Sequence, residues 1–321
     1  MPHRPILLGV VGDSASGKTT LSAGIADILG RDRVSVICVD DYHKYNRLQR
    51  REMQITPLHP ECNHIDIMEQ HLRALAEGEP ILKPVYNHRT GDFDAPEYFK
   101  PRRFVIVEGL LAFHSPRLRD AFHVKVFLDP PEELRRRWKV SRDCAKRGYR
   151  REEVLAELEK REEDSAAYIR PQKRWADIVV RFFQPERAAD DEHLDVRITL
   201  RPTLPQPDLN GLATREGHAV DALRIAVGRD HGQLAEFVEI DGAVTSDQAV
   251  TIEEALWAQQ PELLQLRAGA AGRFVEGQDE HCSRPLALAQ LFIAYHLLLV
   301  RLAKDQLRRE MEARQAEMLS P

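Results

Sequence analysis

The chain has 321 residues, of which 43% are hydrophobic and 30% are charged, and its formal net charge is −5 at pH 7. These values are ordinary for a globular protein, and the negative charge argues against a general affinity for nucleic acid. No uninterrupted apolar run is long enough to span a membrane, so we expect no membrane contact.

The first five residues show no secretion signal, and the four cysteines lack the spacing of a metal site or a disulfide framework. We therefore expect a cytoplasmic protein in a reducing environment. The length exceeds that of one average domain, which predicts a large domain with a smaller appendage.

Predicted strands and helices alternate over the first part of the chain. Short apolar runs predict buried strands, and apolar residues spaced three or four apart predict helices. The predicted strands cover 5–11, 34–39, 104–107, 124–128 and 176–183, and the predicted helices cover 19–29, 65–77, 130–147 and 151–168. The alternation predicts an α/β fold, a doubly wound, mostly parallel sheet with helices on both faces.

The pattern changes near residue 184, where a polar segment containing a proline begins. Alternating runs at 196–200, 222–227 and 237–240 then predict antiparallel strands, and 285–318 predicts a long helix. We therefore predict two domains. The first covers residues 1–189, and the second is a smaller α+β C-terminal domain, residues 190–321, ending in the long helix.

The strongest motif satisfies G-x-x-x-x-G-K-[ST] and lies between a predicted strand and a predicted helix, as a phosphate-binding loop requires. The expected nucleotide-binding residues are Gly12, Asp13, Ser14, Ala15, Ser16, Gly17, Lys18, Thr19 and Thr20. Lys18 is expected to reach the nucleotide phosphates, and the Thr19 hydroxyl is expected to bind Mg²⁺. The sequence lacks an Asn-Lys-x-Asp segment, which favours ATP and kinase chemistry over a GTPase.

Acidic residues directly follow two predicted strands, where ligands bind in such sheets. Asp40 and Asp41 follow the second strand, and Asp40 is the candidate general base that takes the proton of an attacking hydroxyl. Asp41 could instead cap a turn. Glu108 follows the third strand and is the candidate metal ligand opposite Thr19, with a surface glutamate as the alternative.

These motifs together resemble the phosphoribulokinase and uridine kinase family, and most closely its plant and cyanobacterial phosphoribulokinases. The resemblance covers residues 5–182 and rests on the phosphate-binding loop and on the segments at 40–43, 83–91, 107–110, 142–148 and 168–172. It implies ATP-dependent phosphorylation of the C1 hydroxyl of ribulose 5-phosphate, with Mg²⁺, and a small-molecule sugar phosphate as the partner. A homo-oligomer is compatible with the sequence.

The resemblance also implies residue roles. Asp40 matches the family's base and, with Lys18 and Arg142, forms the expected catalytic set. The residues implied in substrate binding are His43, Arg47, Arg51, Asp66, Tyr86, His88, Arg147 and Arg161. Arg147 and Arg161, like the catalytic Arg142, belong to or lie near a flexible lid.

The residues themselves support a phosphorylated substrate. The segment 43–51 concentrates cations just after Asp40, and a phosphate ester needs such cations whereas an unphosphorylated ribose does not. A solvated basic helix face is the alternative, and several lid arginines are expected only to face water.

The sequence departs from the plant-type pattern in two places. Ser16 stands where those enzymes have a cysteine, so Cys38 lacks its disulfide partner, and Leu111 replaces a histidine. Two other functions stay open, a uridine or other nucleoside kinase and a non-catalytic nucleotide-binding regulator. The intact set of Lys18, Thr19, Asp40 and Glu108 argues against the regulator.

Overall fold

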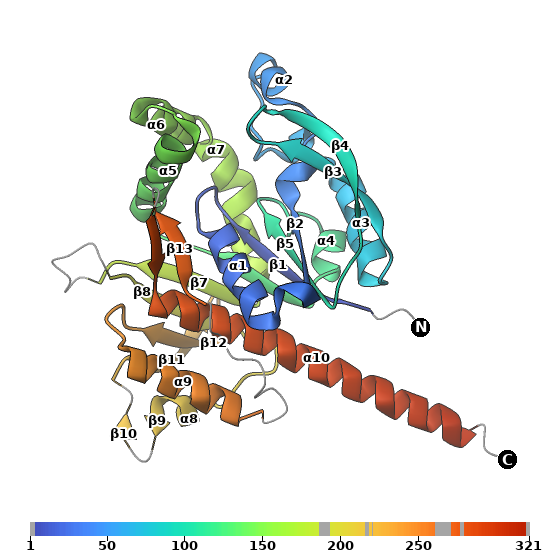
Figure 1. The fold of residues 1–321 in the computed structure, drawn as a ribbon, viewed down its shortest axis with the longest axis vertical. Helices are drawn as coiled ribbons and strands as arrows, with labels where there is room; N and C mark the ends of the chain where they lie inside the picture. Colours follow the sequence, from blue (N-terminus) through green and yellow to red (C-terminus); the bar gives the residue numbers. More distant parts are fainter. Residues whose placement is uncertain are drawn as a thin grey trace.

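A single mixed sheet forms the centre of the molecule (Figure 1). The computed structural model describes residues 4–185, 193–215, 218–219, 221–260, 271–276 and 279–318. The eight described strands of the sheet run in the order β11-β12-β8-β7-β6-β1-β5-β2. The parallel part consists of β7 (Ile178–Phe183), β6 (Val124–Leu128), β1 (Ile6–Gly12), β5 (Phe104–Gly109) and β2 (Val34–Cys38). The antiparallel part consists of β11 (Leu223–Asp230), β12 (Gln233–Ile240) and β8 (Asp195–Leu200).

Helices cover both faces of this sheet. One layer contains α1 (Lys18–Leu29), α9 (Ser246–Ala258) and α10 (Arg284–Met318), and the other contains α3 (Ile65–Ala76) and α4 (Pro116–Asp120). Strand β1 shows why both faces are covered: all of its residues are buried and apolar side chains leave the strand on both sides. Leu8 and Val10 pack in the first layer, whereas Leu7 and Val11 pack in the second, since successive side chains of a strand point to opposite faces. The predicted doubly wound, mostly parallel sheet is confirmed.

The chain beyond residue 190 continues the same sheet. Strand β8 pairs antiparallel with β7, from Leu200 opposite Ile178 to Asp195 opposite Phe183. The three strands and the long helix predicted here appear as β8, β11, β12 and α10. Smaller elements complete this part: α8 (Leu209–Ala213), β9 (Thr214–Arg215), β10 (His218–Ala219), β13 (Arg273–Glu276) and β14 (Asp279–Cys282). The division into domains 1–189 and 190–321 stays a prediction, and both parts contribute to one hydrophobic core.

Helix α10 begins in the core and then projects from the body (Figure 1). Its segment Arg284–Gln315 is long and apolar enough to cross a membrane by composition, with a mean hydropathy of 1.8 over the most apolar window. Of that window, 78% is buried inside the protein, which is typical of the core helix of a globular fold. The expected absence of membrane contact stays a prediction.

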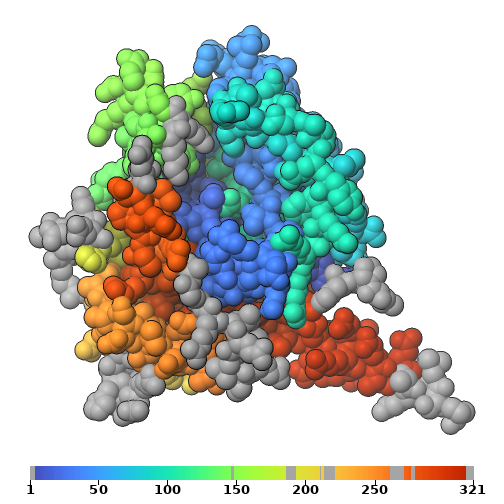
Figure 2. Space-filling view, viewed as in Figure 1, coloured from blue at the N-terminus to red at the C-terminus, as the bar shows by residue number. Residues whose placement is uncertain are grey.

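Two structures stand on either side of the carboxyl ends of the parallel strands. On one side lie α2 (Arg47–Glu52) and a hairpin of β3 (Ile81–Asn87) and β4 (Asp92–Phe99). On the other side lies the lid, which we define as α5 (Glu132–Arg147), α6 (Arg151–Lys160) and α7 (Glu162–Asp164). In Figure 2 the lid (green) and the hairpin (teal) flank a hollow with the blue N-terminal segment between them.

The structure corrects the predicted elements in two places. The hairpin was not predicted, because Pro84 interrupts its first strand and its second strand is almost entirely exposed, which leaves little apolar alternation. The predicted helix 151–168 is broken. After α7 the chain forms one π-helical segment, η4 (Ser165–Ile169), and then a 3₁₀ segment, η5 (Arg170–Trp175).

Candidate active site

The phosphate-binding motif lies between β1 and α1, where the sequence placed it. Ala15 and Gly17 have φ angles of 65° and 95°, and Gly17 immediately precedes the first residue of α1. Turns that contain such left-handed residues are typical of backbone nests whose N–H groups bind anions. The start of α1 adds the positive end of a helix dipole. The loop from Gly12 to Thr19 is therefore built as a phosphate cradle.

Contacts from the lid side of the molecule hold this loop. The buried carboxylate of Asp13 accepts a hydrogen bond from Ser165 Oγ and lies 3.7 Å from Arg170 Nε. Arg135 of α5 donates to the backbone oxygen of Ser14 at 3.1 Å. Asp13 and Ser14 thus connect the cradle to α5, η4 and η5.

Lys18 turns its ammonium back into the loop. Its Nζ donates to the backbone oxygens of Gly12, at 2.9 Å, and Asp13, at 2.8 Å. Burial lowers the pKa of Lys18, and the carboxylates of Asp40 and Glu108 act in the opposite direction. The cation lies among the site's carboxylates, and its contact with nucleotide phosphates stays a prediction.

Thr19 and Glu108 meet at the end of the loop. Thr19 Oγ1 donates to Glu108 Oε1 at 2.9 Å, while Glu108 Oε2 is buried without a hydrogen-bond partner among the described residues. Burial raises the pKa of Glu108. A hydroxyl and a carboxylate with one uncommitted oxygen fit Mg²⁺, which takes few protein ligands and completes its shell with water and phosphate oxygens. The neighbouring Thr20 contributes its backbone oxygen to Gln290 Nε2 of α10, at 3.0 Å.

Ser16 and Cys38 occupy the two positions at which we expect no disulfide, because Ser16 has no thiol. The Ser16 hydroxyl is fully buried and has no hydrogen-bond partner in the described part of the chain. Burial raises the pKa of the Cys38 thiol well above its usual value, and Asp40 and Glu108 add to the effect. Cys38 is therefore a protonated, weakly nucleophilic thiol, and Ser16 offers no sulfur to it.

Asp40 lies in the short helical turn η2 (Val39–Tyr42) directly after β2. A Cβ added to Gly109 would lie 2.4 Å from the Cβ of Val39, so the glycine allows β5 to pack against this turn. Burial acts to raise the pKa of Asp40, but His43 and His88 when protonated, and the cations Lys18 and Arg161, hold it below its usual value. Asp40 is therefore an ionised carboxylate between the loop, the hairpin and the lid.

Asp41 has a different task from its neighbour. Its Oδ2 lies 2.6 Å from Lys83 Nζ, and its Oδ1 accepts the backbone N–H of Tyr86 at 2.9 Å. Both contacts join η2 to β3. Asp41 thus holds the hairpin in place rather than capping a turn.

His43 is buried behind Asp40. Its Nδ1 lies 2.7 Å from Asn63 Oδ1, and burial lowers its pKa to about 4. His43 is therefore uncharged at neutral pH, which corrects its place among the cations of segment 43–51. Its predicted contact with the substrate stays a prediction.

The three arginines of α2 have different surroundings. Arg47 donates to the backbone oxygen of His88 at the tip of the hairpin. Arg50 donates to the Tyr86 hydroxyl at 2.6 Å and lies over its ring, 4.9 Å from the centroid. Arg51 is exposed, and its side chain makes no hydrogen bond or ion pair with any described residue. Arg47 and Arg51 lie four residues apart, on one face of α2, and their predicted contact with the substrate stays a prediction.

The hairpin brings two predicted residues to the base. His88 Nε2 lies 3.8 Å from Asp40 Oδ2. Tyr86 is buried, and its ring meets those of His43, at 4.9 Å, and His88, at 5.1 Å, edge to face. Asp66, by contrast, is exposed in the first turn of α3, and its side chain makes no hydrogen bond or ion pair with these residues of the described structure.

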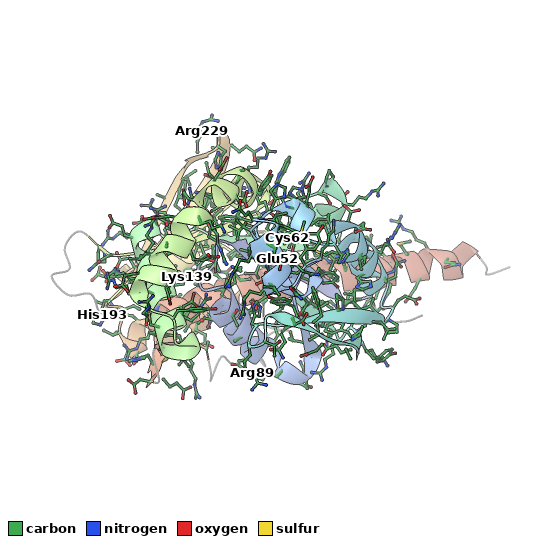
Figure 3. All side chains as sticks on the ribbon, turned by 90° about the horizontal axis from the view of Figure 1, so that it is seen from above. Glu52, Cys62, Arg89, Lys139, His193 and Arg229 are labelled. Atoms are coloured by element: carbon green, nitrogen blue, oxygen red, sulfur yellow. The ribbon has the colours of Figure 1, made fainter. Side chains whose placement is uncertain are left out.

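The lid arginines differ in their relation to Asp40. Arg161 Nε donates to Glu157 Oε1 at 2.7 Å, and the Arg161 charge lowers the pKa of Asp40. Arg142 donates to Asp143 at 2.9 Å, within the lid. The side chain of Arg147 lies outside the described part of the chain. Figure 3 views the molecule from above and shows Lys139 of the lid on one side and Glu52 and Cys62 on the other.

Three arginines that contact residues of the site were not identified from the sequence. Arg50 packs on Tyr86, while Arg135 and Arg170 hold the phosphate-binding loop. Arg135 is only 4% exposed, yet it stands in a row of three consecutive arginines in the sequence. Arg135 could have been found from its position one turn after Pro131, because the first turn of α5 closely follows the carboxyl end of β6.

The cradle, the hydroxyl–carboxylate pair and the strand-end aspartate define a P-loop nucleotide-binding protein. Residues 7–188 match the phosphoribulokinase / uridine kinase family, and the chain belongs to this family. The resemblance noted from the sequence motifs is thereby confirmed.

Individual relatives give the extent of the likeness. The chain is 39% identical over 197 residues to a phosphoribulokinase from Synechocystis sp., which covers 61% of this chain and 59% of that protein. It is 34% identical over 184 residues to a uridine kinase from Chloroflexus aggregans, which covers 56% of this chain and 88% of that protein. The chain thus spans less than two thirds of the length of the phosphoribulokinase. The fold is similar to that of a phosphoribulokinase from Rhodobacter spheroides, with a TM-score of 0.58 at 21% identity, over 82% of this chain and 98% of the other.

Proposed function

We propose that the protein is an ATP-dependent kinase that phosphorylates a hydroxyl of a sugar phosphate. The substrate we propose is D-ribulose 5-phosphate, and the product is D-ribulose 1,5-bisphosphate. The observation that carries this proposal is the position of Asp40, an ionised carboxylate beside Lys18 of the phosphate-binding loop and 3.8 Å from His88 of the hairpin.

In this proposal Asp40 accepts the proton of the C1 hydroxyl while the hydroxyl oxygen forms a bond to the γ-phosphorus of ATP. The bond from that phosphorus to the bridging oxygen breaks, and ADP leaves. Thr19 and Glu108 would hold Mg²⁺, which offsets the charge of the phosphates. Lys18 and a lid arginine, Arg142 or Arg161, stabilise charge on the transferred group. Positioning and electrostatics supply most of the acceleration in such reactions.

The cations around the hollow support a phosphorylated substrate. Arg47, Arg50 and Arg51 stand on α2, and Arg161 faces Asp40 from the lid. Charge-assisted hydrogen bonds from guanidinium groups suit a phosphate ester. A nucleoside brings no such charge to this side of the base, so the arginines would have no substrate group to bind.

A uridine or other nucleoside kinase is the second candidate, favoured by the long match to the Chloroflexus aggregans relative. A release assay for ADP with ribulose 5-phosphate, ribose 5-phosphate, uridine and cytidine separates the two, with the Asp40→Asn protein as the blank. Turnover of ribulose 5-phosphate alone supports the proposal. Turnover of uridine alone overturns it. ATP binding without turnover of any of these would favour the non-catalytic regulator.

The remaining expectations accompany this proposal. ATP and Mg²⁺ are the proposed cosubstrate and cofactor. A cytoplasmic location, the absence of nucleic-acid and membrane partners, and assembly into a homo-oligomer stay predictions.

A further inference from the structure

Asn63 uses every polar atom of its buried side chain. Its Nδ2 donates to the backbone oxygens of Pro57, at 3.1 Å, and His59, at 2.9 Å. Its Oδ1 lies 2.7 Å from His43 Nδ1. Because two carbonyl oxygens take the two amide hydrogens, the orientation of the amide is fixed, and Oδ1 must accept a hydrogen bond. His43 Nδ1 therefore carries a proton.

This bond decides what the other nitrogen of His43 can do. A neutral imidazole with hydrogen on Nδ1 has an unprotonated Nε2, which can only accept a hydrogen bond. His43 Nε2 makes no hydrogen bond to a described residue, and it is not among the fully enclosed polar atoms that lack a partner. An accessible acceptor is thus left beside the base.

The surroundings of the imidazole hold it in this place. The Tyr86 ring meets the His43 ring edge to face at 77°, which restricts the ring plane. The charged and titratable groups that act on His43 are Asp40, Arg50 and His88, so the ring lies among the residues of the site. The backbones of His43 and Asn63 also form an isolated antiparallel bridge, which keeps the two side chains adjacent.

We propose that Asn63 is a positioning residue that holds His43 in its Nδ1–H tautomer, so that His43 Nε2 accepts a hydrogen bond from a sugar hydroxyl. This inference rests on the proposed function. In ribulose 5-phosphate this hydroxyl is on C3 or C4, because C2, next to the carbon whose hydroxyl Asp40 deprotonates, carries a carbonyl that cannot donate a hydrogen bond. An unprotonated nitrogen cannot donate to phosphate oxygens, which are themselves acceptors, so the phosphate end must bind elsewhere, at the arginines. His43 thereby selects for a polyhydroxy chain rather than for charge.

The tautomer is measured directly on the protein without substrate. Two-dimensional ¹H–¹⁵N spectra of histidine-labelled protein at pH 7 report which ring nitrogen of each histidine carries hydrogen, and the His43→Gln protein assigns the His43 signals. We expect a neutral ring protonated on Nδ1. A ring protonated on Nε2, or on both nitrogens, overturns the inference whatever the substrate is.

Two neutral variants test the acceptor role. The amide of His43→Gln reaches the place of Nε2 and can present its carbonyl there, whereas the amide of His43→Asn reaches the place of Nδ1 and keeps the bond to Asn63. We expect the KM for the sugar phosphate to rise about 2- to 10-fold more in His43→Asn than in His43→Gln, the loss of one neutral hydrogen bond. The KM for ATP should be unchanged in both. Equal sugar-phosphate KM values in the two variants would remove the acceptor role.

Asn63→Ala tests the positioning itself. In that protein His43 should show a mixture of tautomers, with a raised sugar-phosphate KM. A His43 that stays entirely protonated on Nδ1 would show that Asn63 does not position it. If Asn63→Ala does not fold, the wild-type spectra still test the tautomer of His43, and the two His43 variants still test whether Nε2 accepts a hydrogen bond from the sugar. Absence of ribulose 5-phosphate turnover by the wild type would instead count against the proposed function, since the tautomer is read without substrate.

Discussion

The ammonium of Lys83 lies 2.6 Å from the carboxylate of Asp41, and the two side chains are only 6% and 14% exposed. This ion pair joins the hairpin to the turn that carries Asp40. Removing Asp41 leaves the buried Lys83 ammonium with only the more exposed Glu97, at 3.4 Å, as an ionic partner. Asp41→Ala should therefore lower the free energy of unfolding, by less than the about 3–5 kcal/mol that a buried charge with no partner costs. Urea denaturation measures it. The double variant Asp41→Leu with Lys83→Met should recover part of the loss, and a single variant as stable as the wild type would contradict the role of the pair.

Asp40→Asn should keep the fold and the affinity for ATP but lose turnover. A general base contributes roughly 10²–10⁴-fold, so kcat should fall within that range. Steady-state kinetics and ATP titration calorimetry check the two parts separately. Near-normal kcat in this variant would remove Asp40 from the role of base.

Glu108→Gln should alter the response to Mg²⁺. The variant keeps the shape of the side chain and an acceptor for Thr19, but it removes the negative charge that the ion requires. We expect half-maximal activity to need more Mg²⁺, with an unchanged KM for the sugar phosphate. A magnesium titration identical to that of the wild type would place the metal elsewhere.

Arg51→Ala should raise the KM for the sugar phosphate and leave the KM for ATP almost unchanged. A charge-assisted hydrogen bond is worth about 1.5–3 kcal/mol, which corresponds to about 10- to 100-fold. Because the side chain of Arg51 is exposed and makes no hydrogen bond or ion pair with the described residues, this variant should be as stable as the wild type. Arg47→Ala should raise the same KM but also loosen the hairpin, since Arg47 binds the His88 backbone. An unaltered KM in Arg51→Ala would contradict a phosphate site on α2.

The protein should lose stability in mild acid through His43. The pKa of this histidine is lowered from 6.5 to about 4 by burial, so between these values the unfolded chain binds a proton that the folded protein does not. Its contribution to stability is therefore present above pH 6.5 and decreases as the pH falls. Between pH 7 and pH 5 it should decrease by roughly 2 kcal/mol. Urea denaturation at both pH values should show a loss of stability that is larger by roughly 2 kcal/mol in the wild type than in His43→Asn. His123, whose pKa is also lowered to about 4, titrates in both proteins and drops out of the comparison.

The sequence predicted those parts of the fold that bury apolar side chains in a regular pattern. Strand β1 and helix α1 were found because burial on both faces gives a continuous apolar run and burial on one face gives helical spacing. The hairpin was not predicted because β4 is exposed and has no apolar pattern. It is held by pairing with β3 and by the contact between Asp41 and Lys83, two residues that are distant in sequence.

The positions of the site residues were predictable where a sequence motif determines the backbone conformation. They were less predictable where several hydrogen-bond partners are available to a side chain. Asp40 follows β2 and Glu108 is the next-to-last residue of β5, so both had to lie at the carboxyl edge of the sheet. The division of work between Asp40 and Asp41, and between Arg47, Arg50 and Arg51, depends on contacts with the hairpin. The charge of His43 depends on burial against Asn63 and Tyr86, which no local pattern records.

The pairing of β7 with β8 has a consequence for any shortened form of the chain. Without the residues after 189, β7 would become an open edge with unpaired amide and carbonyl groups. The face of α1 that packs against α10 would lose its cover as well. A fragment bearing the whole phosphate-binding loop and both acidic residues would then be prone to self-association through its own backbone. The residues after 189 thus cover this edge of the sheet with their own strands, quite apart from any part in chemistry.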